Sequence, residues 1–170
     1  FLNGEHPRVA SLTMAEIERF DIGRLNADTE YGRRFPDQAQ MDGVRVPRLG
    51  ELLHLVSQPR YATACLMLEL KSDPDFAQDS AVRERIVSVI CRDVREAKLA
   101  DRTLLHSFDW ALLAECRRQA PDMPLSFLTQ LQENEHDVGE DSSILVTPDF
   151  SKPDMSVPDE VRKAGGSLWC

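Results

Sequence analysis

An acidic and a basic residue two positions apart, Glu69 and Lys71, close an apolar run that begins at Ala64. Residues i and i+2 of a strand point to the same side, so these two side chains are expected to share one face. A carboxylate there suits a hard cation such as Mg²⁺ or Ca²⁺, and an ammonium beside it suits a phosphate oxygen. A plain ion pair, or a strand end that reaches solvent, explains the same spacing.

A second candidate position lies in the apolar run 102–108, where His106 shares strand parity with Phe108. His106 is therefore a candidate for the same pocket, with a core histidine bonded to backbone as the alternative. The remaining histidines fall in expected loops or beside a helical stripe, and we expect them to be solvated: His6, His54 and His136.

Strand and helix patterns alternate along the chain and must position these residues. Apolar runs of strand length occur at 61–71, 102–108, 125–128 and 167–170. Helical patterns occur at 14–21, 47–58, 80–99, 109–120 and 156–164. Strands separated by helices pair in parallel through right-handed crossovers.

The fold class is therefore α/β. We expect a (β/α)8 TIM barrel that is incomplete in this chain, because such barrels need ~250 residues. An open doubly wound sheet is the alternative, but no GxGxxG turn follows any of the expected strands.

Short-range patterns predict helix boundaries and buried faces. Thr13 and Glu16 form a capping box that starts the first helix, whereas the polar, glycine-bearing segment 24–46 is typical of a loop. The run 64–70 is expected to be buried on both faces. In the helix of 80–99, branched residues at helical spacing are expected to face the core. They are Val82, Ile86, Val89, Ile90 and Val94.

We interpret 1–170 as an internal portion of a single TIM-barrel domain. The chain begins with Phe1 and stops within an apolar stretch at Cys170, whereas natural termini are usually polar. The acidic, unpatterned segment near 132–156 is expected to be a long loop excursion.

Composition excludes several classes of protein. The chain has 20 Lys and Arg against 29 Asp and Glu, a net charge of −9 and a pI near 4.9, which disfavours a nucleic-acid or anionic-membrane binder. No apolar run approaches the ~20 residues that cross a bilayer, so no membrane span is expected. The four cysteines lack metal-binding spacing and are expected to be buried thiols. We favour the cytoplasm; the periplasm is the alternative, because the native N-terminus is expected to be missing.

The strand 66–71, Leu-Met-Leu-Glu-Leu-Lys, resembles the L-N-I-E-I-K strand of the glycerophosphodiester phosphodiesterase family, a TIM-barrel family. Three further segments resemble family motifs in the same order. Residues 12–23 resemble L-T-L-A-E-L…L-D-A-G, residues 44–53 resemble R-I-P-T-L-E-E-V-L, and residues 106–109 resemble the S-S-F-D that ends the next strand. The resemblance covers roughly residues 2–113.

The resemblance implies metal-assisted hydrolysis of a small-molecule glycerophosphodiester to an alcohol and glycerol 3-phosphate. It assigns Glu69 to a divalent metal, Mg²⁺ or Ca²⁺, Lys71 to the substrate phosphate, and Phe108 to the glycerol end of the pocket. It assigns no catalytic residue in this chain, because the family's two histidines, its H-R-G strand and its E-x-D pair would precede Phe1. Met67 departs from the family's usual Asn, which removes one polar contact.

Two other functions remain open at this point. A related TIM-barrel phospholipase, phosphatidylinositol-specific or sphingomyelinase D-like, would need an apolar mouth for lipid, and the acidic stretch 133–141 speaks against it. A non-catalytic relative would bind a phosphate ligand or a partner without turnover. Upstream H-R-G and E-x-D motifs, and activity on glycerophosphocholine against a phospholipid, distinguish the three.

Overall fold

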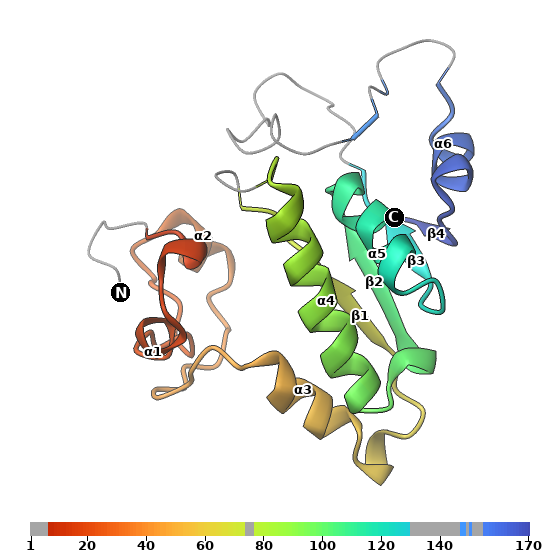
Figure 1. Ribbon diagram of the computed structural model, residues 1–170. Helices are drawn as coiled ribbons and strands as arrows, with labels where there is room; N and C mark the ends of the chain where they lie inside the picture. The colour runs from red at the N-terminus through yellow and green to blue at the C-terminus, as the bar shows by residue number, and fades with distance from the viewer. Residues whose placement is uncertain (1–6, 74–76, 130–146, 149, 151–154) are drawn as a thin grey trace. The chain divides into compact units, whose positions relative to one another are not determined.

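Four strands form a parallel sheet in which sequence order is also spatial order, β1-β2-β3-β4 (Figure 1). Their bounds are Leu66–Glu69 for β1, Thr103–Ser107 for β2, Leu125–Phe127 for β3 and Leu168–Trp169 for β4. Helix α4 (Ser80–Glu96) and η3 (Ala100–Arg102) lead from β1 to β2, and α5 (Trp110–Gln119) leads from β2 to β3. This succession is that of a (β/α)8 barrel, incomplete in this chain. The predicted α/β class and parallel pairing are confirmed.

The computed structural model describes residues 7–73, 77–129, 147, 148, 150 and 155–170. These residues belong to two compact units, Phe1–Leu52 and Leu53–Cys170, and the sheet lies in the second. Most of the predicted loop near 132–156 falls outside the described residues, as do His6 and His136. Within the described ranges, none of the helices has both the length and the apolar composition that crossing a bilayer requires.

Helix α5 packs on one face of the sheet. Leu105 and Phe127 are buried on that face, and Leu113 of the helix is completely buried. Trp110 packs edge-on against Phe127 with 4.6 Å between ring centroids, and such pairs contribute ~0.5–1.5 kcal/mol beyond burial. Strand residues of the opposite parity are therefore left on the face that α5 does not cover.

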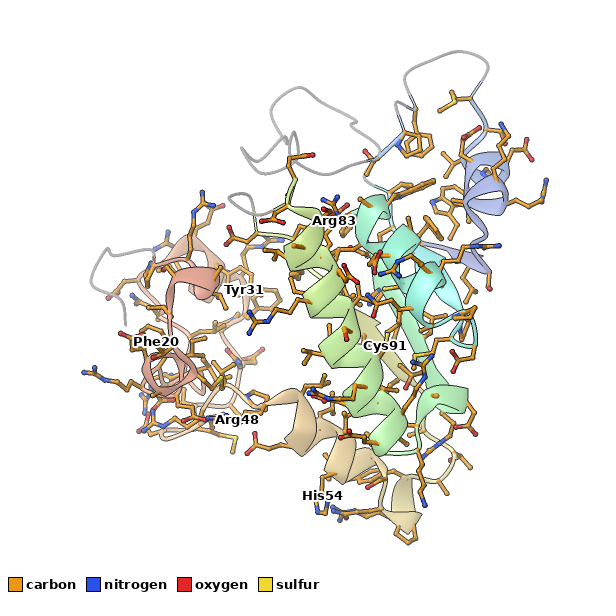
Figure 2. All side chains as sticks on the ribbon, in the orientation of Figure 1. Phe20, Tyr31, Arg48, His54, Arg83 and Cys91 are labelled. Atoms are coloured by element: carbon orange, nitrogen blue, oxygen red, sulfur yellow. The ribbon has the colours of Figure 1, made fainter. Side chains whose placement is uncertain are left out.

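The buried stripe of α4 differs from the predicted one. Val87, Cys91 and Val94 are buried at helical spacing, whereas Val89 is exposed, and of the five predicted residues only Val94 is buried. Cys91 lies on the side of α4 that faces α5 (Figure 2), where Cys116 is also buried. The prediction was wrong because it placed Ile86 and Ile90 in the stripe, whereas the buried positions are the next residues, Val87 and Cys91. A cysteine packs as a small apolar side chain, and including it turns the stripe toward α5.

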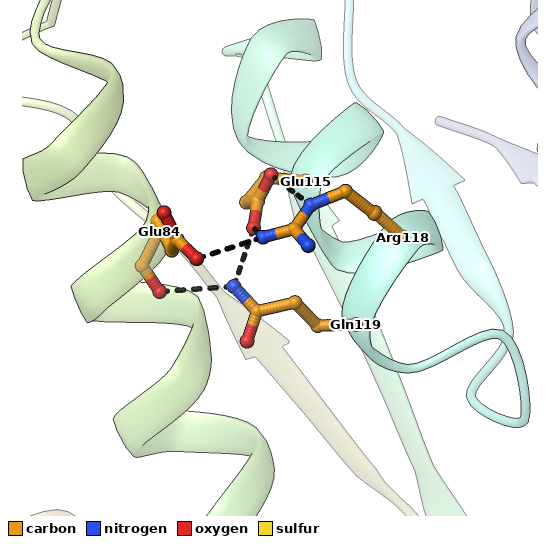
Figure 3. Close-up of polar contacts among 4 residues, drawn as sticks. All are labelled: Glu84, Glu115, Arg118 and Gln119. Carbon is orange, nitrogen blue, oxygen red and sulfur yellow. Dashed lines mark hydrogen bonds and ion pairs between the residues drawn. The ribbon is translucent and has the colours of Figure 1, made fainter.

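A polar cluster joins α4 and α5 where both are exposed (Figure 3). Arg118 pairs with Glu84 at 3.1 Å and with Glu115 at 2.5 Å, and the Gln119 amide donates to the Glu84 carbonyl oxygen at 3.0 Å. The hydrogen bond from Arg118 lowers the pKa of Glu115. Because Arg118 is exposed, each pair contributes under ~1 kcal/mol. Apolar burial between the helices therefore supplies most of the stability of this contact.

Helix α6 (Val157–Ala164) confirms the helix predicted over 156–164, and two glycines follow it. Gly165 has a left-handed conformation with φ of 80°, which a residue without a β-carbon adopts at no steric cost. A β-carbon on Gly166 would lie 2.6 Å from both the Phe127 ring and the Val161 side chain. The chain therefore enters β4 by passing tightly against the central aromatic ring of the core.

Short helices precede the sheet, and the Thr13–Glu16 capping box is confirmed. α1 ends earlier than predicted, because the Asp21 carboxylate accepts the backbone N–H of Gly23 at 3.0 Å and of Gly43 at 2.6 Å and holds the chain in a loop. These hydrogen bonds also lower the pKa of Asp21. The bounds are η1 (Val9–Ser11), α1 (Met14–Ile17), α2 (Glu30–Arg34), α3 (Leu49–Val56) and η2 (Pro59–Tyr61).

Helix α2 corrects the prediction of a loop over 24–46. The Thr29 hydroxyl accepts the backbone N–H of Gly32 at 3.0 Å and caps the helix. A β-carbon on Gly32 would lie 2.0 Å from the carbonyl oxygen of Asn26, so a glycine is needed for this close approach. The glycine content of 24–46 predicts a loop. Here Gly32 instead allows the short helix α2 to pack closely against Asn26, which precedes it in the chain.

Candidate functional site

The carboxyl end of β1 carries Glu69 and Lys71 on one face, as strand alternation predicts. Lys71 Nζ lies 2.9 Å from Glu69 Oε1, and their side chains are 76% and 30% exposed. Leu66 and Leu70 are buried on the opposite face, whose parity matches the β2 residues under α5. The pair therefore points away from α5 and is not enclosed in the helix-covered core.

The prediction that β1 is buried on both faces was wrong. Met67, which shares the face of Glu69, is 53% exposed. In a closed barrel this face would be the interior, and the described strands form only part of such a barrel. The side chains of this face are therefore those that a complete barrel would turn toward its centre.

Strand register places Glu69, His106 and Ser126 in one row across β1, β2 and β3. His106 is half-buried, and in the described part of the chain its Nδ1 is the one buried side-chain nitrogen or oxygen without a hydrogen-bond partner. An unpaired buried polar atom costs ~1–3 kcal/mol. A polar group bound on this face, or a water molecule, would satisfy it. His106 thus lies where parity predicts, and its role stays a prediction.

Phe108 follows β2 with the same parity as His106 and is half-buried. Its neighbours Ser107 and Asp109 have the opposite parity and are buried. By alternation the aromatic ring belongs to the side of the sheet that carries Lys71, where it can form an apolar wall. Contact between Phe108 and a glycerol group stays a prediction.

Three polar residues that were not predicted as site residues link the ends of β1 and β2. Ser107 Oγ donates to the Leu70 carbonyl oxygen at 2.6 Å and accepts the backbone N–H of Asp109 at 2.9 Å. Ser72 Oγ donates to Asp109 Oδ2, while Asp109 Oδ1 accepts the N–H of Ala111 at 2.9 Å and caps α5. The alternation in Ser107-Phe108-Asp109 could have identified them. If Phe108 faces the site, Ser107 and Asp109 face the core, and buried polar groups need hydrogen-bond partners.

The Glu69 carboxylate has the oxygen donors that a hard cation prefers, but one carboxylate does not make a metal site. Among the described residues, no three His, Cys, Asp or Glu side chains come close enough together to share a metal ion. His54 is exposed on α3 (Figure 2). A cation at Glu69 would therefore need ligands beyond a cluster of three such side chains, which the described residues do not form.

Two cavities are lined by other residues. One of about 440 Å³ lies in the first unit and is lined in part by Tyr31 and Phe35, whose rings are 5.1 Å apart. The other, of about 430 Å³, lies at the start of β3 and is lined in part by Arg117 and Asp122. None of the residues predicted for the phosphate site lines either cavity.

Sequence comparison matches residues 3–162 to the glycerophosphoryl diester phosphodiesterase family. Among solved structures, a provisionally assigned glycerophosphoryl diester phosphodiesterase from Silicibacter pomeroyi DSS-3 is 48% identical, with a TM-score of 0.85. The alignment covers 98% of this chain and 52% of that protein, so the chain spans about half the length of this relative. No curated protein matches the chain in sequence.

Two more distant structures share the fold. A provisionally assigned glycerophosphodiester phosphodiesterase from Galdieria sulphuraria is 22% identical, with a TM-score of 0.51 over 73% of this chain and 40% of that one. A glycerophosphodiester phosphodiesterase from Parabacteroides distasonis ATCC 8503 is 17% identical, with a TM-score of 0.50 over 81% of this chain and 45% of that one. At these identities the likeness concerns the fold alone.

Proposed function

The chain belongs to the glycerophosphoryl diester phosphodiesterase family, and we propose that the full-length gene product hydrolyses glycerophosphodiesters with the aid of a divalent cation. The products would be an alcohol and glycerol 3-phosphate. The family match and the 48%-identical relative support this reaction class. The observation that carries the proposal for these residues is the Glu69–Lys71 pair on the open face at the carboxyl end of β1.

Each proposed role follows from the charge and position of a side chain. When bound, a divalent cation supplies charge neutralisation on the phosphate and a lowered pKa for the attacking hydroxyl. Glu69 offers a carboxylate oxygen, a donor that Mg²⁺ and Ca²⁺ both accept. Lys71 holds a phosphate oxygen as a compact point charge. Phe108 borders the glycerol end of the substrate with an apolar surface.

Substrate binding would exchange the ion pair between Glu69 and Lys71 for two separate contacts. Because Lys71 is largely exposed, the existing pair contributes under ~1 kcal/mol, and opening it costs little. The ammonium then faces a phosphate oxygen while the carboxylate faces the cation. Both charges keep an opposite partner throughout, which avoids an uncompensated charge on the sheet.

An assay of the full-length gene product with glycerophosphocholine tests this proposal. We expect release of glycerol 3-phosphate in the presence of Mg²⁺ or Ca²⁺, loss of that release with a chelator, and loss of turnover in Glu69→Ala with an unchanged circular dichroism spectrum. Cation-independent release would overturn the role of the metal. Turnover of a phospholipid in its place, or phosphate binding without turnover, would favour one of the two alternative functions.

A further inference from the structure

Lys71 lies between two anchored residues, but its own side chain is exposed and is held only by the ion pair with Glu69. Its side chain is 76% exposed, so packing does not hold it in one direction. It also lies beyond the end of β1, where the ladder to β2 closes with the bond from Leu70 N–H to the His106 carbonyl oxygen at 2.8 Å. The direction of the ammonium therefore depends on its pairing with Glu69 and on how the backbone is held around residue 71.

Two side-chain hydrogen bonds hold that backbone, one on each side of Lys71. On the near side, Ser107 Oγ donates to the Leu70 carbonyl oxygen at 2.6 Å. On the far side, Ser72 Oγ donates to Asp109 Oδ2. Both anchors belong to the junction of β2 and α5, 37 residues further along the chain.

The anchors themselves are rigid. Ser107 and Asp109 are each 1% exposed, and Ser107 Oγ also accepts the Asp109 N–H at 2.9 Å. The Asp109 carboxylate caps α5 through the N–H of Ala111, at a helix end that favours negative charge. Hydrogen bonds to a carboxylate are about twice as strong as neutral ones. The Ser72 contact is therefore tied to a buried, helix-anchored charge.

We propose that Ser107, Asp109 and Ser72 are positioning residues that hold the backbone on both sides of Lys71 and so direct its ammonium to the phosphate. This inference rests on the proposed contact between Lys71 and the substrate phosphate. In this proposal the residues 107–109 have different roles. Phe108 faces the site, while Ser107 and Asp109 hold the chain at the end of β1. Ser72, which lies outside the motifs matched in the sequence, completes the arrangement.

The variant Ser72→Ala removes only the hydrogen bond between Ser72 and Asp109, because Asp109 still caps α5 when the Ser72 hydroxyl is absent. In the full-length gene product we expect about a tenfold rise in KM, and in the inhibition constant of inorganic phosphate, with kcat nearly unchanged. Ser72→Thr keeps the hydroxyl and is expected to restore both values. Asp79→Ala is the matched control, because Asp79 caps a different helix, α4, through the N–H groups of Ala81 and Val82.

A double-mutant cycle separates positioning from general stability. In a Lys71→Ala background, Ser72→Ala should change KM less than about twofold, because the two residues act through one contact. Full additivity, or an effect of Ser72→Ala no larger than that of Asp79→Ala, would overturn the inference. If Lys71→Ala itself leaves KM unchanged, the proposed function fails instead.

Hydrogen exchange gives a readout that does not depend on activity. The Leu70 amide, which donates to the His106 carbonyl oxygen at 2.8 Å, is expected to exchange faster in Ser72→Ala than in the unmodified protein, while the amides of α5 keep their protection because its cap is intact. Unchanged exchange of the Leu70 amide would contradict the proposed anchoring even in a protein that shows no turnover.

Discussion

Glu69 and His106 are register partners on β1 and β2, and each carries a polar side chain on the face that α5 leaves open. Glu69 is paired with Lys71 at 2.9 Å, whereas Nδ1 of His106 has no hydrogen-bond partner. The row therefore holds a carboxylate whose partner is exposed to solvent and an imidazole nitrogen, Nδ1 of His106, that is buried without a partner. Such incomplete pairing is typical of a surface that a polar ligand completes.

Lys71→Ala is expected to raise KM for a glycerophosphodiester by about 10-fold or more, because a hydrogen bond between charged groups contributes ~1.5–3 kcal/mol. Lys71→Arg keeps the charge and should show a smaller loss. The thermal midpoint should move little, since the exposed pair contributes under ~1 kcal/mol. Steady-state kinetics with calorimetry checks both points, and a normal KM in the alanine variant would contradict the assignment.

His106→Leu is expected to stabilise the ligand-free protein while lowering affinity for substrate. The substitution removes a buried nitrogen that has no partner, whose burial costs ~1–3 kcal/mol, and keeps an apolar side chain in place. Chemical denaturation and KM measured on the same preparations provide the test. A loss of stability together with unchanged KM would show that His106 is a packing residue.

Gly166→Ala is expected to destabilise the protein by about 1–3 kcal/mol, because the new β-carbon would lie 2.6 Å from the Phe127 ring and from Val161. Gly50→Ala is the matched control. Gly50 lies within α3 and its β-carbon would meet no atom within 4 Å, so this substitution should stabilise by about 0.5–1 kcal/mol. Urea denaturation of both variants decides the matter, and equal effects would refute the tight contact.

Burial raises the pKa of the Cys116 thiol to about 12 and also raises that of Cys91. Only the thiolate is nucleophilic, so both cysteines should resist iodoacetamide in the native protein, while the exposed Cys65 reacts. Mass spectrometry of native and denatured samples checks this expectation. Labelling of native Cys116 as fast as Cys65 would disprove it.

The same shift has a consequence for stability, since the folded thiol keeps its proton at a pH where the unfolded thiol loses it. The contribution of Cys116 is fully present below the unfolded pKa of ~8.5 and is lost as the pH rises from there toward the folded value. Cys116→Ala should therefore flatten the alkaline decline in stability, and an identical decline in both proteins would contradict it.

Local patterns predicted the elements that position the site. The apolar runs ending at Glu69 and Ser107 are strands, and Asp109 caps the helix that follows. The prediction of buried cysteines was right for Cys91 and Cys116 but wrong for Cys65 and Cys170, which are exposed. Burial depends on which faces other elements cover, and a single segment does not contain that information.

Contacts between distant segments were the part that the sequence left open. Ser72 and Asp109 lie 37 residues apart, and neither shows by itself that the other is its partner. Helix α2 depends in the same way on the close approach of Gly32 to Asn26. Strand parity could still have indicated that Asp109 is buried, and a buried carboxylate needs donors.

The most direct test of the central claim is a crystal structure of the full-length gene product grown with Mn²⁺ and inorganic phosphate. The account predicts an anomalous peak at about 2.0–2.6 Å from a Glu69 carboxylate oxygen, and a phosphate oxygen within hydrogen-bond distance of Lys71 Nζ. A cation and phosphate bound elsewhere, with Glu69 still paired only to Lys71, would contradict it.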